Sequence, residues 1–148
     1  MTPWRRLPLA VLCLVWAGVV IGISFIEAPV KFRAPTLTRT VALDVGRTVF
    51  QASQLVQAGL GALALGAAFW GRVGRWVWLC LAAVGAALAL QMAWIFPLLD
   101  ARAEAIIAGT TPVGWPMLHT LYGALEVLKL LALGAAAVLA LRSDSLER

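Results

Sequence analysis

Four long stretches of apolar residues divide this chain, separated by short polar or turn-forming segments. They cover about residues 7–26, 47–70, 76–98 and 117–141. Each is about 20 residues or longer, enough to cross a hydrocarbon core of about 30 Å at about 1.5 Å per residue. Backbone groups in lipid must bond within their own segment, so each stretch should be a helix. The pattern predicts an all-α fold: an integral membrane four-helix bundle that forms one domain over residues 1–148.

The segments between the apolar stretches differ in length. The second connection, residues 71–75, is short and predicts an antiparallel hairpin of the second and third spans. The first connection, residues 27–46, begins with the expected helix breakers Pro29 and Pro35. From Thr36 onward its residues look amphipathic, so we expect a short interfacial helix between spans one and two. The third connection, residues 99–116, ends in a stretch rich in glycine and proline.

Small residues recur at intervals of four along three of the predicted spans. The stripes are Gly18 and Gly22; Ala58, Ala62 and Gly66; and Gly85, Ala89 and Ala93. Such faces let helices approach closely in lipid, although alanine and glycine are abundant throughout this chain. We expect a compact bundle in either case.

The composition agrees with a membrane location. The chain is 62% hydrophobic and 13% charged, whereas soluble domains have about 25% charged residues. Its net charge of +5 does not indicate nucleic-acid binding, because most of the basic residues flank the apolar stretches and form no stripe. We expect the lipid bilayer as the main partner, with a homo-oligomer or a larger membrane complex as a further association.

The positions of the basic residues predict an orientation. Those on the side of the two termini are Arg5, Arg6, Arg72, Arg75, Arg142 and Arg148. Those on the other side are Lys31, Arg33, Arg39, Arg47 and Arg102. The counts are nearly balanced, but the first helix usually dominates and a pair of arginines precedes it. We therefore expect a multi-pass protein of the bacterial inner membrane with both termini cytoplasmic.

Polar residues inside the apolar stretches form the candidate site. Spacings of three and four place several of them on one helical face, toward the outer membrane surface in this topology. Glu126 and Lys129 lie deepest, where an unpaired charge costs at least about 2.5 kcal/mol, so both should face the bundle interior. The predicted polar pocket opens outward and is lined by Glu27, Arg47, Gln51, Gln54, Gln91, His119, Tyr122, Glu126 and Lys129.

A purely structural interpretation of the same residues stays open. Glu126 and Lys129 are three positions apart and could neutralise each other on one helix. Arg47 could pair with Asp44 or with Glu27 near the membrane surface. The glutamines could form interhelical hydrogen bonds worth about 0.6 kcal/mol each. None of these roles requires a ligand.

Cofactor and catalytic chemistry have little support in the sequence. Cys13 and Cys80 lie singly in apolar stretches without a CxxC pair, as small hydrophobic residues do. The single histidine, His119, cannot supply both axial ligands of a haem. His119 and Glu126 are separated by about 10 Å along a helix, too far for a direct catalytic hydrogen bond. We expect no cofactor and no metal site, and we favour a protein without enzymatic activity.

Short motifs carry a family resemblance. Their positions are Ala28-Pro29 with Phe32, Gly46 with Phe50, and His119. In these the chain resembles the TMEM205-like group of small membrane proteins (the DUF4149 family), with its "AP-x-x-F", "G-x-x-F" and "His-x6-Asn" elements. The second element matches only roughly, and Glu126 stands where the third has Asn. The resemblance implies a four-span bundle and brings no established activity.

Two functions fit these features. Small size, the GxxxG pattern and short loops favour an accessory or structural membrane subunit. The alternative is binding or transport of a small solute or ion, in one form coupled to protons, through the polar pocket in the outer half of the bundle. Glu126 and Glu27 would then be the charge-carrying groups. A dry, fully paired interior favours the first function, and a solvated pocket favours the second.

Overall fold

The computed structural model describes residues 3–111 and 117–142 of the chain. Within these ranges the chain is helical and has no strand, which confirms the all-α fold. The helices that are long and apolar enough to cross a membrane are, among these residues, Leu7–Arg33, Arg39–Gly71, Arg75–Ile107 and Leu118–Arg142. Their length and apolarity suggest a multi-pass membrane protein. The predicted turn-rich segment at 112–116 and Arg148 lie outside the described residues.

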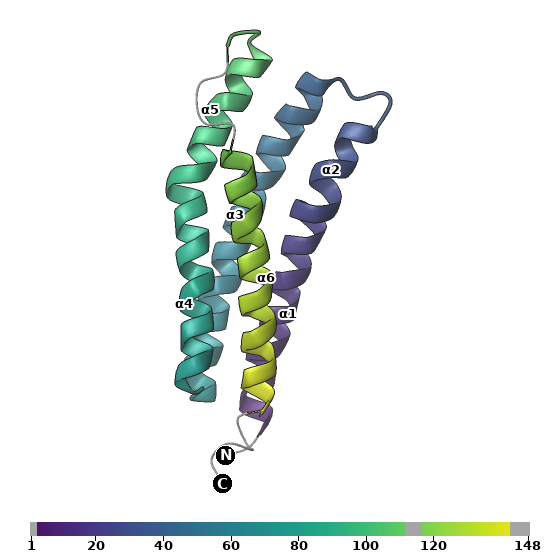
Figure 1. Ribbon diagram of the computed structural model, residues 1–148. Coiled ribbons are helices and arrows are strands. Elements are labelled where there is room, and N and C mark those ends of the chain that lie inside the picture. The colour runs from purple at the N-terminus through teal and green to yellow at the C-terminus, as the bar shows by residue number, and fades with distance from the viewer. Residues whose placement is uncertain (1–2, 112–116, 143–148) are drawn as a thin grey trace.

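The four long helices alternate in direction and form an antiparallel bundle (Figure 1). Helix α6 (Leu118–Arg142) packs against α1 (Leu7–Val20) and α4 (Arg75–Leu90). On the opposite side α3 (Arg39–Gly71) also packs against α1 and α4. Toward the end of the bundle that holds α2 (Ala28–Val30) and α5 (Phe96–Ile107), the helices diverge (Figure 1).

A tight turn joins α3 to α4 at the end of the bundle nearer the termini. Arg72 ends α3 in the left-handed conformation (φ 46°), and its backbone N–H donates to the carbonyl of Phe69. Gly74 then precedes α4 in extended conformation. The second and third spans therefore form the antiparallel hairpin that the short connection predicts.

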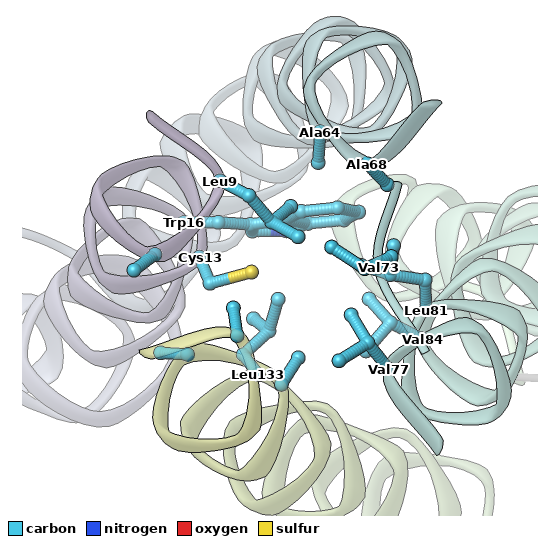
Figure 2. Packing of buried hydrophobic residues seen from close by; sticks show 14 of the residues in the cluster. Leu9, Cys13, Trp16, Ala64, Ala68, Val73, Val77, Leu81, Val84 and Leu133 are labelled. Atoms are coloured by element: carbon cyan, nitrogen blue, oxygen red, sulfur yellow. The ribbon is translucent and has the colours of Figure 1, made fainter. Parts of the chain in front are cut away.

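The apolar core fills the half of the bundle nearer the termini. Side chains from all four long helices meet there, including Leu9, Cys13, Trp16, Ala68, Val77 and Leu133 (Figure 2). The Trp16 indole packs against the backbone of α3 at Gly61, where a Cβ would lie 3.1 Å from the ring. This close approach lets the largest side chain of the core reach across to a neighbouring helix.

The small-residue stripes face away from this core. Gly18, Gly66 and Gly85 are exposed, and a Cβ at any of them would have no other atom within 4 Å. The bundle interior is instead packed with alanines at other positions, namely Ala10, Ala64, Ala68, Ala136, Ala137 and Ala140. The stripes therefore do not pack the interior of this bundle, which agrees with the abundance of alanine and glycine throughout the chain.

Two of the long helices contain a π-helical segment just before a proline. The segment η2 (Ile21–Glu27) precedes Pro29, and η4 (Gln91–Ile95) precedes Pro97. Proline cannot donate the backbone hydrogen bond of an α-helix, and a local change to π-helix accommodates the missing donor. Pro29, an expected helix breaker, therefore lies inside the first long helix, which continues to Arg33.

The segment expected to form a separate interfacial helix is the beginning of α3. Thr38 caps this helix, because its side-chain oxygen accepts a hydrogen bond from the backbone N–H of Val41 at 3.3 Å. From Arg39 the helix runs without interruption to Gly71, so a short separate helix is not shown. The third long helix likewise continues through α5 to Ile107, into the predicted connection at 99–116.

Candidate functional site

A buried ion pair lies on the inner face of α6. Nζ of Lys129 is 2.8 Å from Oε1 of Glu126, and neither side chain is exposed to solvent. Their three-residue spacing brings both side chains to the same face of the helix. Pairing neutralises two charges whose separate burial would be very costly. The intrahelical pairing considered as the structural interpretation is therefore present.

Gln57 of α3 extends this pair across the bundle. Its Oε1 accepts hydrogen bonds from Nζ of Lys129 at 2.7 Å and from Nε1 of Trp16 at 3.1 Å. Its Nε2 donates to the hydroxyl of Ser53 at 3.2 Å. Because Trp16 belongs to α1, the buried amide of Gln57 links α1, α3 and α6.

Gln91 connects the third long helix to the same ion pair. Its Nε2 donates to Oε1 of Glu126 at 2.8 Å and to the backbone carbonyl of Tyr122 at 3.3 Å. Gln91 is the first residue of η4, and π-helical segments are frequent at functional sites. All four long helices thus contribute to one buried polar network, which consists of Trp16, Ser53, Gln57, Gln91, Glu126 and Lys129.

Three polar atoms in and beside this network have no hydrogen-bond partner among the described residues. They are Nε2 of Gln54, Oε1 of Gln91 and Oε2 of Glu126. Each side chain is buried, and that of Gln54, the most accessible, is 4% exposed. Leaving such an atom unpaired costs about 1–3 kcal/mol. This side of the network therefore has unused capacity to bind a polar group.

A cavity of about 510 Å³ lies on the side of the network away from the chain termini. Its wall comes from all four long helices, where they diverge. The wall is largely apolar and includes Phe25, Phe32, Phe50, Phe96, Leu99 and Ile106. Tyr122 also lines the cavity and lies one turn before Glu126 on α6, so it stands between the cavity and the buried polar network.

Ion pairs hold charged groups at the cavity. Nε of Arg47 is 2.8 Å from Oδ1 of Asp100, and Nη2 of Arg47 is 2.6 Å from Oε1 of Glu104. These contacts join α3 to α5. On the first helix, Nζ of Lys31 is 3.3 Å from Oε2 of Glu27. Arg47, Asp100 and Lys31 all line the cavity.

The Lys31 ammonium lies among aromatic rings. It is 5.4 Å from the ring centroid of Phe50 and 5.6 Å from that of Phe32, within the range of cation–π attraction. A Cβ at Gly46 would lie 2.5 Å from Nζ, so a residue without a side chain provides the space for the ammonium. The cavity wall therefore contains a cation whose side chain is only 8% exposed.

The structure divides the predicted pocket residues between two adjoining regions. Those in or beside the buried network are Gln54, Gln91, Tyr122, Glu126 and Lys129. Arg47 and His119 line the cavity instead. Glu27 pairs with the cavity residue Lys31, whereas Gln51 is exposed and does not line the cavity.

Several residues of both regions were not among the predicted ones. They are Trp16, Ser53, Gln57, Lys31, Asp100 and Glu104. The spacing of Gln57, four residues after Ser53, places both on one helical face and could have indicated it. Asp100 and Glu104 are also four residues apart, a helical spacing inside a predicted connection.

The two regions offer different chemistry. The network supplies a neutralised ion pair with a few unpaired polar atoms, and the cavity supplies apolar walls with charged groups. Among the described residues, no group of three or more His, Cys, Asp or Glu side chains could hold a metal ion. Comparisons of the chain with protein-family models, with curated proteins and with solved structures find no match.

Proposed function

We propose that this chain is a multi-pass membrane protein that binds a small amphipathic molecule in the cavity at the outer end of its bundle. The observation that supports this function is the cavity itself, about 510 Å³ in volume, with aromatic walls and charged groups. Its volume falls within the range of about 300–1,000 Å³ that is usual for small-molecule sites. The phenylalanines would contact the apolar part of the ligand, and Lys31, Arg47 or His119 would contact its polar part.

The position of the cavity along the bundle supports an amphipathic ligand. Trp70 and Trp76 are exposed at the end nearer the termini, as tryptophans at a membrane surface are. From there a hydrocarbon core of about 30 Å spans about 20 residues of each helix, to the level of the exposed Trp94. Arg47 and Asp100 then lie at the opposite membrane surface, where amphipathic molecules gather.

The proposal includes the orientation and the relationship expected from the sequence. The arginines near the start of α1 and in the α3–α4 turn support cytoplasmic termini in a bacterial inner membrane, with the cavity opening to the periplasm. The four-helix layout is compatible with a distant relationship to the TMEM205-like group. Neither point is needed for ligand binding.

A photoaffinity experiment tests the binding function. The protein in lipid nanodiscs would be irradiated with a diazirine-bearing medium-chain carboxylic acid and, separately, with the corresponding amine. Peptide mapping should show saturable labelling of segments 24–32, 42–50 and 96–106. Ala103→Trp places an indole in the cavity, whereas Ala101→Trp places the same ring at an exposed position of α5 that does not line it.

Binding in the cavity predicts that Ala103→Trp abolishes the saturable labelling and that Ala101→Trp retains it. The stronger of the two probes then gives the sign of the charge that the ligand carries. Equal, non-saturable labelling of both variants by both probes would refute the function, because it would show only partitioning into lipid.

A second candidate, an accessory or structural membrane subunit, is supported by the outward-facing glycines. Gly18 and Gly85 leave open space at the bundle surface, which a helix of another copy or of a larger complex could fill. Subunit counting in native membrane would compare Gly18→Leu with Gly85→Leu. Loss of association in one variant alone identifies the face used, and a monomeric wild type with no crosslinked partner rules this role out.

A further inference from the structure

The three unpaired atoms beside the ion pair differ in kind and complement one another. Nε2 of Gln54 is a donor, and Oε1 of Gln91 and Oε2 of Glu126 are acceptors. One water molecule donates two hydrogen bonds and accepts others, so it satisfies one donor and two acceptors at once. A site of this composition therefore matches water better than it matches a purely donating or purely accepting ligand.

The contacts of these residues place the atoms in one neighbourhood. Gln91 donates to Oε1 of Glu126 at 2.8 Å, so the free oxygens belong to two groups that already touch. The Gln54 side chain interacts with that of Tyr122, one turn before Glu126 on α6. Among the described residues, Nε2 of Gln54 has no partner that meets the geometric criteria of a hydrogen bond. The free atoms thus belong to buried side chains of α3, η4 and α6.

A metal cation fits this position poorly. Lys129 already holds its ammonium 2.8 Å from Oε1 of Glu126, so a second cation would meet a like charge at short range. Gln54 also presents a donor, which repels a cation. Water is therefore the small ligand that fits both the charges and the polar atoms of this site.

Tyr122 lies between this site and the outer cavity. Its side chain lines the cavity, its backbone carbonyl accepts from Gln91, and its side chain lies close to Gln54. Toward the termini, the described buried side chains form the apolar core, which includes Leu9, Cys13 and Leu133 (Figure 2). Solvent therefore has its shortest polar route to Glu126 from the cavity.

We propose that a water molecule binds among Gln54, Gln91 and Glu126 and exchanges with the outer cavity past Tyr122. The Glu126 carboxylate, although fully buried, is then in contact with solvent on one side of the membrane only. This inference rests on the buried polar network and the cavity, and it does not depend on which ligand the cavity binds.

Water-edited solid-state NMR of the wild-type protein in lipid tests the site. The protein would carry ¹³C-labelled Glu and Gln, and conservative variants would assign the side-chain carbonyl signals. Polarisation from water should reach Gln91 and Glu126 several-fold faster than it reaches Gln57. Gln57 is the matched control, because it is equally buried, touches the same Lys129 ammonium, and has protein partners for both its side-chain oxygen and nitrogen.

Equally slow transfer to Gln91, Glu126 and Gln57 would overturn the proposal, since it would show that the site is dry. The route has its own test in the Trp variants of α5. Ala103→Trp should slow the transfer to Glu126 by filling the cavity, and Ala101→Trp should leave it unchanged. Unchanged transfer in both would show that water does not enter through the cavity.

Discussion

Replacing Lys129 by methionine should destabilise the protein strongly, because it leaves the Glu126 carboxylate buried without its cation. Both side chains are 0% exposed, and Nζ lies 2.8 Å from Oε1. At an effective dielectric constant of about 20, charges at this distance attract by about 6 kcal/mol. Desolvation costs several kcal/mol for each ion and offsets most of that attraction. The intact pair therefore adds little, but an unpaired partner keeps its whole desolvation cost.

The expected loss is about 3–5 kcal/mol, the range for breaking a buried ion pair. The double variant Glu126→Gln/Lys129→Met removes both charges and leaves an amide that Gln91 can still contact, so most of the stability should return. Glu104→Gln is the control, since the Glu104 side chain is 60% exposed in its pair with Arg47, which keeps Asp100 as a second partner. Its expected cost is below about 1 kcal/mol.

Unfolding in mixed micelles with increasing SDS, followed by circular dichroism, gives the four free energies of unfolding for comparison. The decisive quantity is the difference between Lys129→Met and the double variant. If the double variant is no more stable than Lys129→Met, the uncompensated charge is not the cause of the loss. Lys129→Met as stable as Glu104→Gln would equally refute the reasoning, because it would mean that Glu126 without Lys129 is not a costly buried charge.

Three further substitutions test other contacts. Gly46→Ala should displace the Lys31 ammonium at little cost in stability, because only the end of a flexible side chain must move. Reductive methylation of Lys31, followed by ¹³C NMR, should then be faster than in the wild type. An unchanged rate would contradict the contact between Gly46 and Lys31. Trp16→Phe should lower the free energy of unfolding by about 1 kcal/mol for the lost hydrogen bond to Gln57, plus a loss of packing. The same SDS unfolding measures it. An unchanged free energy of unfolding would mean that the bond does not stabilise the bundle. Arg47→Ala should speed amide exchange in α5, because it removes the ion pairs to Asp100 and Glu104. The effect should be smaller at high salt, which screens these partly exposed pairs. Equal exchange of the variant and the wild type at low salt would exclude the link between α3 and α5.

The helical fold follows from apolar length, but the helix ends do not. The stretches that cross lipid must be helical, so hydropathy alone predicts their existence. It does not predict where helices end, because Pro29 and Pro97 are accommodated by π-helical segments that have no simple sequence signature. Asp100 and Glu104 end the apolar stretch without ending the helix, since a helix that leaves the membrane can continue into water.

The candidate site was predictable where charge burial is costly. Glu126 and Lys129 could be identified because charges inside an apolar stretch must face the interior. The sequence could not show that Gln54 is buried and Gln51 exposed, since residues three apart share a helical face over one turn only. The buried face of α3 returns at intervals of four or seven residues, at Ser53, Gln57 and Ala64, and Gln51 falls outside it.

The buried polar network explains how a closely packed bundle can open into a cavity at one end. In the apolar core nearer the termini, small and apolar side chains would allow each helix several rotations about its own axis, because alanine-rich faces are alike. Trp16, Gln57, Gln91 and Lys129 each belong to a different long helix, so their hydrogen bonds select one rotation for all four. Buried polar groups are best attested in such a register-setting role. Beyond the network the helices diverge (Figure 1), and the chosen rotation turns Tyr122 and the phenylalanines toward the cavity. The structural and the binding interpretations of the polar residues thus concern adjoining layers of one molecule, in which the paired charges orient the helices that enclose the cavity.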